Sequence, residues 1–124
     1  MENVYNKSLI KSFGYAFEGL FHAIKYNRNL RIHLVAALMV IATSIFFHVT
    51  PFEKGILGIM ILLVISSEMI NTAIEEMVDL ITSEHKKEAK VAKDVAAGMV
   101  LIAAIGSVIV GLLIFTPYVL RLFK

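Results

Sequence analysis

Three long apolar segments dominate the pattern of hydrophobic and polar positions along the chain. They cover residues 32–49, 55–80 and 95–120, and each is about long enough to cross a bilayer, which takes ~20 residues. The middle segment reaches this length only when the polar residues toward its C-terminal end are counted. Because a soluble domain of 124 residues could not bury three such segments, the pattern predicts one all-α membrane domain, residues 1–124, with three transmembrane helices.

Ahead of these spans, residues 7–26 carry a different pattern. Their apolar positions recur at helical spacing, at Leu9, Phe13, Phe17, Leu20, Phe21 and Ile24. Charged residues lie toward the other side, so the pattern predicts an amphipathic helix on the membrane surface; a helix that packs on a loop is the alternative. We expect no cleavable signal sequence, because this region contains no uninterrupted apolar stretch.

The basic residues are distributed unevenly between the two sides of the predicted membrane domain. Nine of the twelve precede the first span or separate the second from the third: Lys7, Lys11, Lys25, Arg28, Arg31, Lys86, Lys87, Lys90 and Lys93. Because cytoplasmic loops carry an excess of Lys and Arg, the N-terminus and the loop at 81–94 are predicted to be cytoplasmic. A basic cytoplasmic rim attracts anionic lipid, and no nucleic-acid partner is expected.

The second predicted span ends in a cluster of polar side chains. These side chains share an arc of about 100° on a helix that turns ~100° per residue: Glu68, Asn71, Thr72, Glu75 and Asp79. Glu68 lies deepest, and an ionised carboxylate at that depth needs a polar cavity, a cation or a partner. The shared face is therefore a candidate functional site that opens toward the cytoplasm.

The residue types on this face limit its chemistry. Carboxylate and amide oxygens suit Mg²⁺ rather than zinc or copper. The chain has no cysteine, and its four histidines form no pair at helical metal-binding spacing. It also lacks the sequence motifs of soluble nucleotide-binding enzymes. Across the loop, Lys93 and Asp94 stand at the start of the third span, where a lysine beside a Mg²⁺ site is suited to hold nucleotide phosphates.

Two other interpretations of the polar face stay open. In a structural interpretation, Asn71 and Thr72 form bonds across helices, and the carboxylates pair with Lys90 or Lys93. In a conduit interpretation, the face relays ions or protons through a small oligomer, as intramembrane carboxylates do in many pumps. Residues 55–65 offer no polar group to continue such a path, which favours a site open to one side.

The motif on this face resembles a known family. The residues E-M-I-N-T-A-I-E at 68–75, Asp79, and A-K-D at 92–94 closely resemble the bacterial integral-membrane diacylglycerol kinase family, which includes the undecaprenol kinases of Gram-positive bacteria. The resemblance runs from G-Y at 14–15 through the third span. It implies a homotrimer in the bacterial inner or plasma membrane, with active sites between subunits at the cytoplasmic interface. There, MgATP would phosphorylate a lipid hydroxyl.

The resemblance also implies roles for residues of the second span. Glu68 corresponds to the catalytic base beside the lipid hydroxyl, Asn71 to a polar partner in the active site, and Glu75 to the Mg²⁺ ligand. The depths of these residues agree with the implied roles, because Glu68 would meet a substrate embedded in the membrane and Glu75 a nucleotide arriving from water.

Four further residues are implied on the nucleotide side. Lys93 and Asp94 would hold the ATP phosphates, with Asp94 also organising the catalytic site. Tyr15 and Gly19, on the surface helix, would lie near the nucleotide.

One position departs from the family pattern. Where the family has glutamate before R-N-x-R-I-H, this chain has Asn27, at a place implied to bind Mg²⁺. Asparagine keeps an oxygen ligand but loses the charge, so we expect weaker binding of Mg²⁺ and ATP and reduced activity.

Two remaining features bear on substrate and assembly. The absence of cysteine and the N-R-N and R-I-H segments within residues 27–33 resemble the Gram-positive branch of the family, and this resemblance implies undecaprenol rather than diacylglycerol as the lipid. In the third span, Ala103, Ser107 and Gly111 recur at four-residue spacing, which would let helices pack closely within or between subunits.

Overall fold

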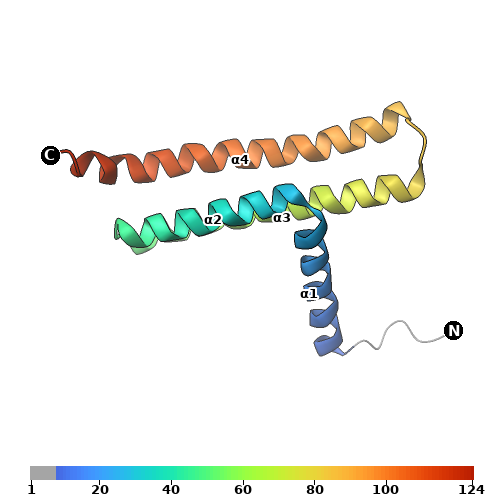
Figure 1. The fold of residues 1–124 in the computed structure, drawn as a ribbon, viewed down its shortest axis with the longest axis horizontal. Coiled ribbons are helices and arrows are strands. Elements are labelled where there is room, and N and C mark those ends of the chain that lie inside the picture. The colour runs from blue at the N-terminus through green and yellow to red at the C-terminus, as the bar shows by residue number, and fades with distance from the viewer. Residues whose placement is uncertain (1–7) are drawn as a thin grey trace.

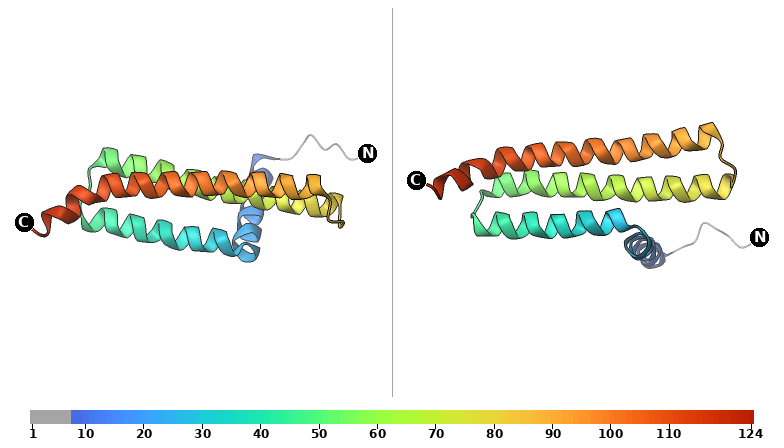
Figure 2. Two further views of the ribbon diagram at one scale, coloured as in Figure 1. Left: turned by 90° about the horizontal axis from the view of Figure 1, so that it is seen from above. Right: turned by 45° about the horizontal axis from the view of Figure 1, so that its top comes forward.

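The computed structural model describes residues 8–124, which form four helices and no strand. The helices are α1 (Leu9–Tyr26), α2 (Arg28–Phe46), α3 (Pro51–Ile81) and α4 (Lys87–Arg121). Lys7, the first residue of the predicted surface helix, lies outside the described residues. The long helices α2, α3 and α4 run side by side with α3 between its two neighbours, and α1 leaves them crosswise (Figure 1 and Figure 2).

The three long helices are each long and apolar enough to cross a membrane, judged by length and composition. Many of their large apolar side chains are exposed in the single chain; Leu62 and Leu113, for example, are 66% and 72% exposed. A soluble monomer rarely exposes so much contiguous apolar surface. The prediction of an all-α membrane protein with three candidate spans is therefore confirmed.

Local sequence explains where the helices begin and end. Thr50 caps α3, because its hydroxyl accepts from the Glu53 backbone N–H at 3.3 Å while the Glu53 carboxylate accepts from the Thr50 N–H at 2.8 Å. Pro51 occupies the first helical position, so α3 begins four residues before the apolar segment predicted to start at 55. Between α1 and α2, Asn27 alone lies outside the two helices.

A small apolar core lies where α3 begins and α4 ends. It contains the buried residues Val49, Leu57 and Ile114, with aromatic side chains packed around them. Beside this core, the Tyr118 hydroxyl donates to Glu53 Oε2 at 2.6 Å, which joins α4 to the first turn of α3. Apolar packing and polar pairing thus fix these two helices together at this end.

The small residues of α4 do not all support close packing within one chain. Ala103 is buried against its neighbours. A methyl group in place of the Gly111 hydrogen, by contrast, would meet no atom of a neighbouring helix within 4 Å. Gly111 instead lines an apolar cavity of about 360 Å³ between α2, α3 and α4. The close approach predicted for this stripe is therefore absent at Gly111 within the single chain.

Candidate functional site

Burial along the polar face of α3 decreases toward the C-terminal end of the helix. Glu68 and Asn71 are only 2% and 6% exposed, whereas Glu75 and Asp79 are exposed and Thr72 is intermediate. A carboxylate as enclosed as Glu68 needs partners, because burying an unpaired charge is costly. The structure supplies these partners from the beginning of α2.

Asn27 joins α1, α2 and α3 at one point. Its backbone N–H donates to the Ala23 carbonyl at the end of α1. Its side-chain oxygen accepts from the Leu30 backbone N–H at 3.0 Å, which caps α2. The amide nitrogen donates to Thr72 Oγ1 at 2.6 Å and to Glu68 Oε2 at 3.1 Å. The residue expected to bind Mg²⁺ therefore also forms a link between helices, and its amide holds the buried carboxylate.

His33 is a member of this site that the sequence patterns did not identify. Its Nε2 atom lies 3.4 Å from Glu68 Oε1, and its side chain is 26% exposed. One sequence signal was available, because His33 is the sole histidine or charged residue between Ile32 and Phe47 in an otherwise apolar segment. A polar side chain in such a place is usually retained for a contact in the bundle interior.

Asn71 and Glu75 form a second pair on the same face. The Asn71 amide donates to Glu75 Oε1 at 2.9 Å. The Asn71 side-chain oxygen is buried and has no hydrogen-bond partner among the described residues. An orphaned acceptor of this kind is uncommon in folded proteins and is often found where a ligand or ion binds.

A polar cavity of about 280 Å³ opens beside Glu75, between the start of α2 and the exposed part of α3. It is lined by Tyr26, Asn27, Arg28, Asn29, Thr72, Glu75, Glu76 and Asp79. Three of these lining residues are carboxylates, and one is an arginine. The cavity thus combines hard oxygen ligands with a group able to contact phosphate.

The side-chain oxygens near this cavity could supply only part of the coordination shell of Mg²⁺. Within residues 8–124, no three His, Asp or Glu side chains lie close enough together to hold a metal ion by themselves. Mg²⁺ commonly takes one or two carboxylates and completes its shell with waters and substrate phosphates. Glu75, with the unpaired oxygen of Asn71 beside it, fits that requirement.

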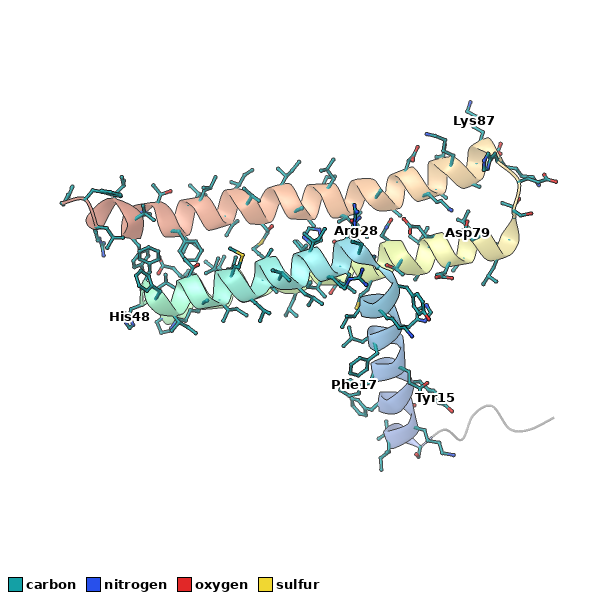
Figure 3. All side chains as sticks on the ribbon, in the orientation of Figure 1. Tyr15, Phe17, Arg28, His48, Asp79 and Lys87 are labelled. Atoms are coloured by element: carbon teal, nitrogen blue, oxygen red, sulfur yellow. The ribbon has the colours of Figure 1, made fainter. Side chains whose placement is uncertain are left out.

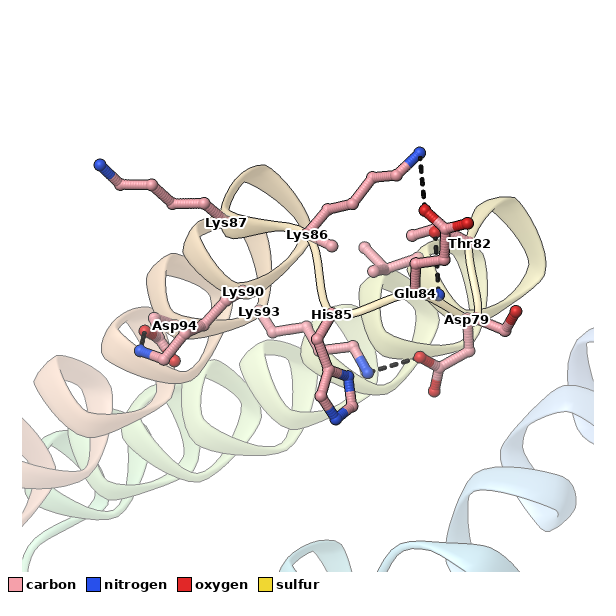
Figure 4. A pocket seen from close by; sticks show the side chains of 12 residues that line it. Asp79, Thr82, Glu84, His85, Lys86, Lys87, Lys90, Lys93 and Asp94 are labelled. Carbon is pink, nitrogen blue, oxygen red and sulfur yellow. Dashed lines mark hydrogen bonds and ion pairs between the residues drawn. The ribbon is translucent and has the colours of Figure 1, made fainter.

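Two of the lysine–carboxylate pairs around the α3–α4 connection, those of Lys93 and Lys90, are arranged differently (Figure 4). Lys93 reaches across to α3, where its Nζ lies 2.5 Å from Asp79 Oδ1. Asp94 instead pairs with Lys90 on its own helix, at 2.6 Å. The structural interpretation of the polar face is thus met for Asp79, which pairs with a lysine, and for Thr72, which bonds across helices to Asn27. Glu68 has partners of another kind. The two lysines and their carboxylate partners, Lys90, Lys93, Asp79 and Asp94, line a cavity of about 790 Å³ around the loop.

The two candidate residues of α1 lie apart from the α3 face in the single chain. Figure 3 shows Tyr15 on the part of α1 that extends away from the three long helices. Gly19 belongs to the same helix. Nearer its C-terminal end α1 does approach α3, since His22 Nε2 lies 3.9 Å from Glu76 Oε1. Only this last part of α1 adjoins the polar cavity.

Comparison with known proteins agrees with this architecture. The model of the family described as prokaryotic diacylglycerol kinase matches residues 14–115. An undecaprenol kinase of Bacillus subtilis is 42% identical over 107 residues, which cover 86% of this chain and 87% of that protein. A diacylglycerol kinase of Synechocystis sp. is 40% identical over 116 residues, covering 93% of this chain and 66% of that longer protein.

A diacylglycerol kinase of Escherichia coli is more distant, at 35% identity over 101 residues, or 82% of this chain and 83% of that protein. The family match spans α2, α3 and most of α1 and α4, and so includes every residue of the polar face. The relatives named here are all kinases of lipids. The chain therefore belongs to the prokaryotic diacylglycerol kinase family of membrane lipid kinases.

Proposed function

We propose that this protein transfers the γ-phosphate of ATP to the hydroxyl of a membrane lipid. The observation that carries the proposal is the gradient of burial along α3, from Glu68 at 2% exposed to the exposed Glu75 and Asp79. A lipid hydroxyl and a water-soluble nucleotide approach from opposite directions, and this one helix face presents a carboxylate to each. Membership of the lipid kinase family supports the same reaction.

In the proposed reaction, the lipid oxygen attacks the γ-phosphorus while Glu68 accepts the hydroxyl proton. A new oxygen–phosphorus bond forms, the bond from the γ-phosphorus to the β–γ bridging oxygen breaks, and ADP leaves. Transfer of this kind depends mainly on positioning and on neutralising charge. The buried position of Glu68 suits a base, because low solvent exposure keeps water away from the proton transfer.

The nucleotide side of the site has separate contributors. We assign Glu75 to Mg²⁺, which neutralises phosphate charge when bound, and Asn71 to orienting Glu75 through their 2.9 Å hydrogen bond. Lys93 and Asp94 are assigned to the ATP phosphates. Lys93 would have to leave Asp79 to reach them, and because that pair is exposed, its loss costs little.

Tyr15 and Gly19 lie near the nucleotide in this proposal only if α1 of one subunit covers the site of another. The position of Tyr15 on the part of α1 that extends from the bundle (Figure 3) supports sites shared between subunits, as in the homotrimer that the family resemblance implies. The distribution of basic residues supports placing the N-terminus and the site on the cytoplasmic side of a bacterial inner or plasma membrane.

Asn27, where the family has glutamate, changes how this chain would hold Glu68 and Mg²⁺. A glutamate here would bring a second negative charge toward Glu68 Oε2, which now accepts from the Asn27 amide at 3.1 Å. Such a pair of carboxylates would need a cation between them. We therefore propose that this chain holds Glu68 without a metal ion, at the expense of weaker Mg²⁺ and ATP binding and a lower rate.

The experiment is phosphate transfer from labelled MgATP by the purified protein in lipid-doped micelles, with undecaprenol and diacylglycerol offered separately. We expect undecaprenol to be the better substrate, and we expect Asn27→Glu to raise the rate and lower the Mg²⁺ concentration needed for half-maximal activity. An unchanged rate and Mg²⁺ requirement in Asn27→Glu would refute the role given to Asn27. No transfer to either lipid, with or without the substitution, would refute the kinase function of this chain and return attention to a conduit.

A further inference from the structure

We infer that His33 is a positioning residue for Glu68, which sets the direction in which this carboxylate presents its free lone pair to the lipid hydroxyl. The inference rests on the proposed kinase function. Its first support is contact: His33 Nε2 lies 3.4 Å from Glu68 Oε1, across the interface between α2 and α3.

The second support is the charge balance around Glu68. Among residues 8–124, His33 is the one His, Lys or Arg side chain with a nitrogen close enough to a Glu68 oxygen for an ion pair, which would form when the imidazole ring is protonated. Lys90 and Lys93 are engaged with other carboxylates at the far end of α3. A carboxylate that is 2% exposed has little help from water, so stabilisation of its negative charge depends on the two polar groups that face its oxygens, the Asn27 amide and the His33 ring.

The third support is that the two oxygens of Glu68 have different partners. Oε2 accepts from the Asn27 amide at 3.1 Å, and Oε1 faces His33. A carboxylate has about four lone-pair positions, so each oxygen keeps one available after these contacts. With both ends of the group held from α2, rotation of the carboxylate about its last bond is restricted, and the remaining lone pairs point in fixed directions.

The surroundings of His33 make this contact stronger than it would be in water. Besides touching Glu68, His33 lines the apolar cavity of about 360 Å³ between α2, α3 and α4, whose other lining residues carry no charge. Electrostatic interactions increase in strength as the local dielectric constant falls. Removing His33 would therefore leave Oε1 facing an apolar space, and the carboxylate would turn toward other donors.

Such a turn would displace the base from the lipid hydroxyl. A displacement of about 1 Å in an active site lowers a rate by as much as ~100-fold. For His33→Leu we expect kcat to fall about 10- to 100-fold, with the KM for ATP nearly unchanged, because Glu75 and the nucleotide side do not contact His33. His33→Gln keeps an N–H donor at similar reach, and we expect it to recover much of the lost kcat.

The experiment compares four full-length proteins in the same lipid-doped micelles: wild type, His33→Leu, His33→Gln and His48→Asn. His48 is a histidine in the α2–α3 turn with a left-handed backbone (φ 50°), which asparagine tolerates, and it serves as the matched control. Initial rates are measured against lipid and ATP concentrations separately, and the midpoint of thermal unfolding (Tm) is recorded for each protein.

A selective loss of kcat in His33→Leu, recovered in His33→Gln and absent in His48→Asn, is the expected result. Wild-type kcat in His33→Leu would overturn the inference and leave the kinase function standing. Equal losses in both His33 variants, together with a lowered Tm, would also overturn it, because they indicate a purely structural residue. A wild type that transfers phosphate to neither lipid would refute the kinase function itself, a result distinct from the other two.

Discussion

Two regions of α3, its first turn around Glu53 and its middle around Glu68, each hold a carboxylate that contacts a neighbouring helix, and the contrast between them separates stability from function. At the Glu53 end (Thr50, Glu53, Tyr118), Glu53 Oε2 accepts from the Thr50 N–H, the Thr50 hydroxyl and the Tyr118 hydroxyl at 2.6–2.8 Å. In the Glu68 region (Asn27, His33, Glu68, Asn71), the carboxylate is more deeply buried but accepts one hydrogen bond at 3.1 Å.

The difference lies in how fully the polar groups are satisfied. Glu53 is half-buried and has three donors beside a packed apolar core, an arrangement that stabilises a helix start and needs nothing more. Glu68 keeps lone pairs free in a buried place, and the Asn71 oxygen beside it has no partner among the described residues. Buried polar groups with spare capacity cost stability, and proteins keep them mainly where a substrate or ion completes the set.

The largest expected effect is in the Glu68 region. Glu68→Gln removes the proposed base, and loss of general base catalysis lowers a rate by ~10²–10⁴-fold. Stability should not fall, because a neutral amide removes the cost of a buried charge. Phosphate transfer and Tm are measured on the same preparation. Glu53→Gln is the matched control, with activity retained; an active Glu68→Gln protein would remove the basis of the comparison.

The next effect is at the Glu53 end of α3 and should change stability alone. Leu57 is 5% exposed in the core where α3 begins, and truncating a buried leucine to alanine costs about 2 kcal/mol or more. We expect Leu57→Ala to lower the free energy of unfolding by that amount, measured by denaturant titration in micelles, and to retain its transfer rate below the unfolding transition. Leu62→Ala, on the same helix but 66% exposed, is the control and should change little. A fall in the transfer rate of folded Leu57→Ala would show that the Glu53 end and the Glu68 region are coupled.

The polar face itself could be predicted from sequence, because helical geometry fixes which residues of one helix share a side. Glu68, Asn71 and Glu75 do lie together on α3, as their spacing required. Contacts between helices were harder to predict, because they depend on how two helices are offset along their axes. That offset decides that His33, rather than a lysine, meets Glu68, and no period within a single segment encodes it.

Adjacency in the sequence does not by itself bring two side chains to the same partner. Lys93 and Asp94 are consecutive, but neighbouring residues on a helix point ~100° apart. Lys93 therefore reaches Asp79 on α3, while Asp94 pairs with Lys90 one turn earlier. Their proposed joint role on ATP requires the phosphates to bridge the two side chains, and this gives the next prediction.

Lys93→Met should raise the KM for ATP about tenfold, the effect expected from losing one charge-assisted hydrogen bond worth ~1.5 kcal/mol. Stability should change little, because the Lys93–Asp79 pair is exposed to solvent. Lys90→Met is the matched control, since it removes a lysine from the same helix whose partner lies within that helix. Initial rates against ATP concentration distinguish the two variants, and equal KM values for both would argue against a specific phosphate contact at Lys93.

The smallest expected effect is again at the Glu53 end. Thr50→Ala removes the side chain that caps α3 and one of the donors to Glu53, and loss of such a cap costs about 1 kcal/mol. Unfolding in micelles should register this loss while phosphate transfer stays at the wild-type rate. Thr116→Ala is the control, because the Thr116 hydroxyl donates to the Leu112 carbonyl within α4 and caps no helix. If Thr50→Ala slowed transfer as well, a change in the first turn of α3 would affect the position of Glu68. Stability at the Glu53 end and activity in the Glu68 region would then not be independent.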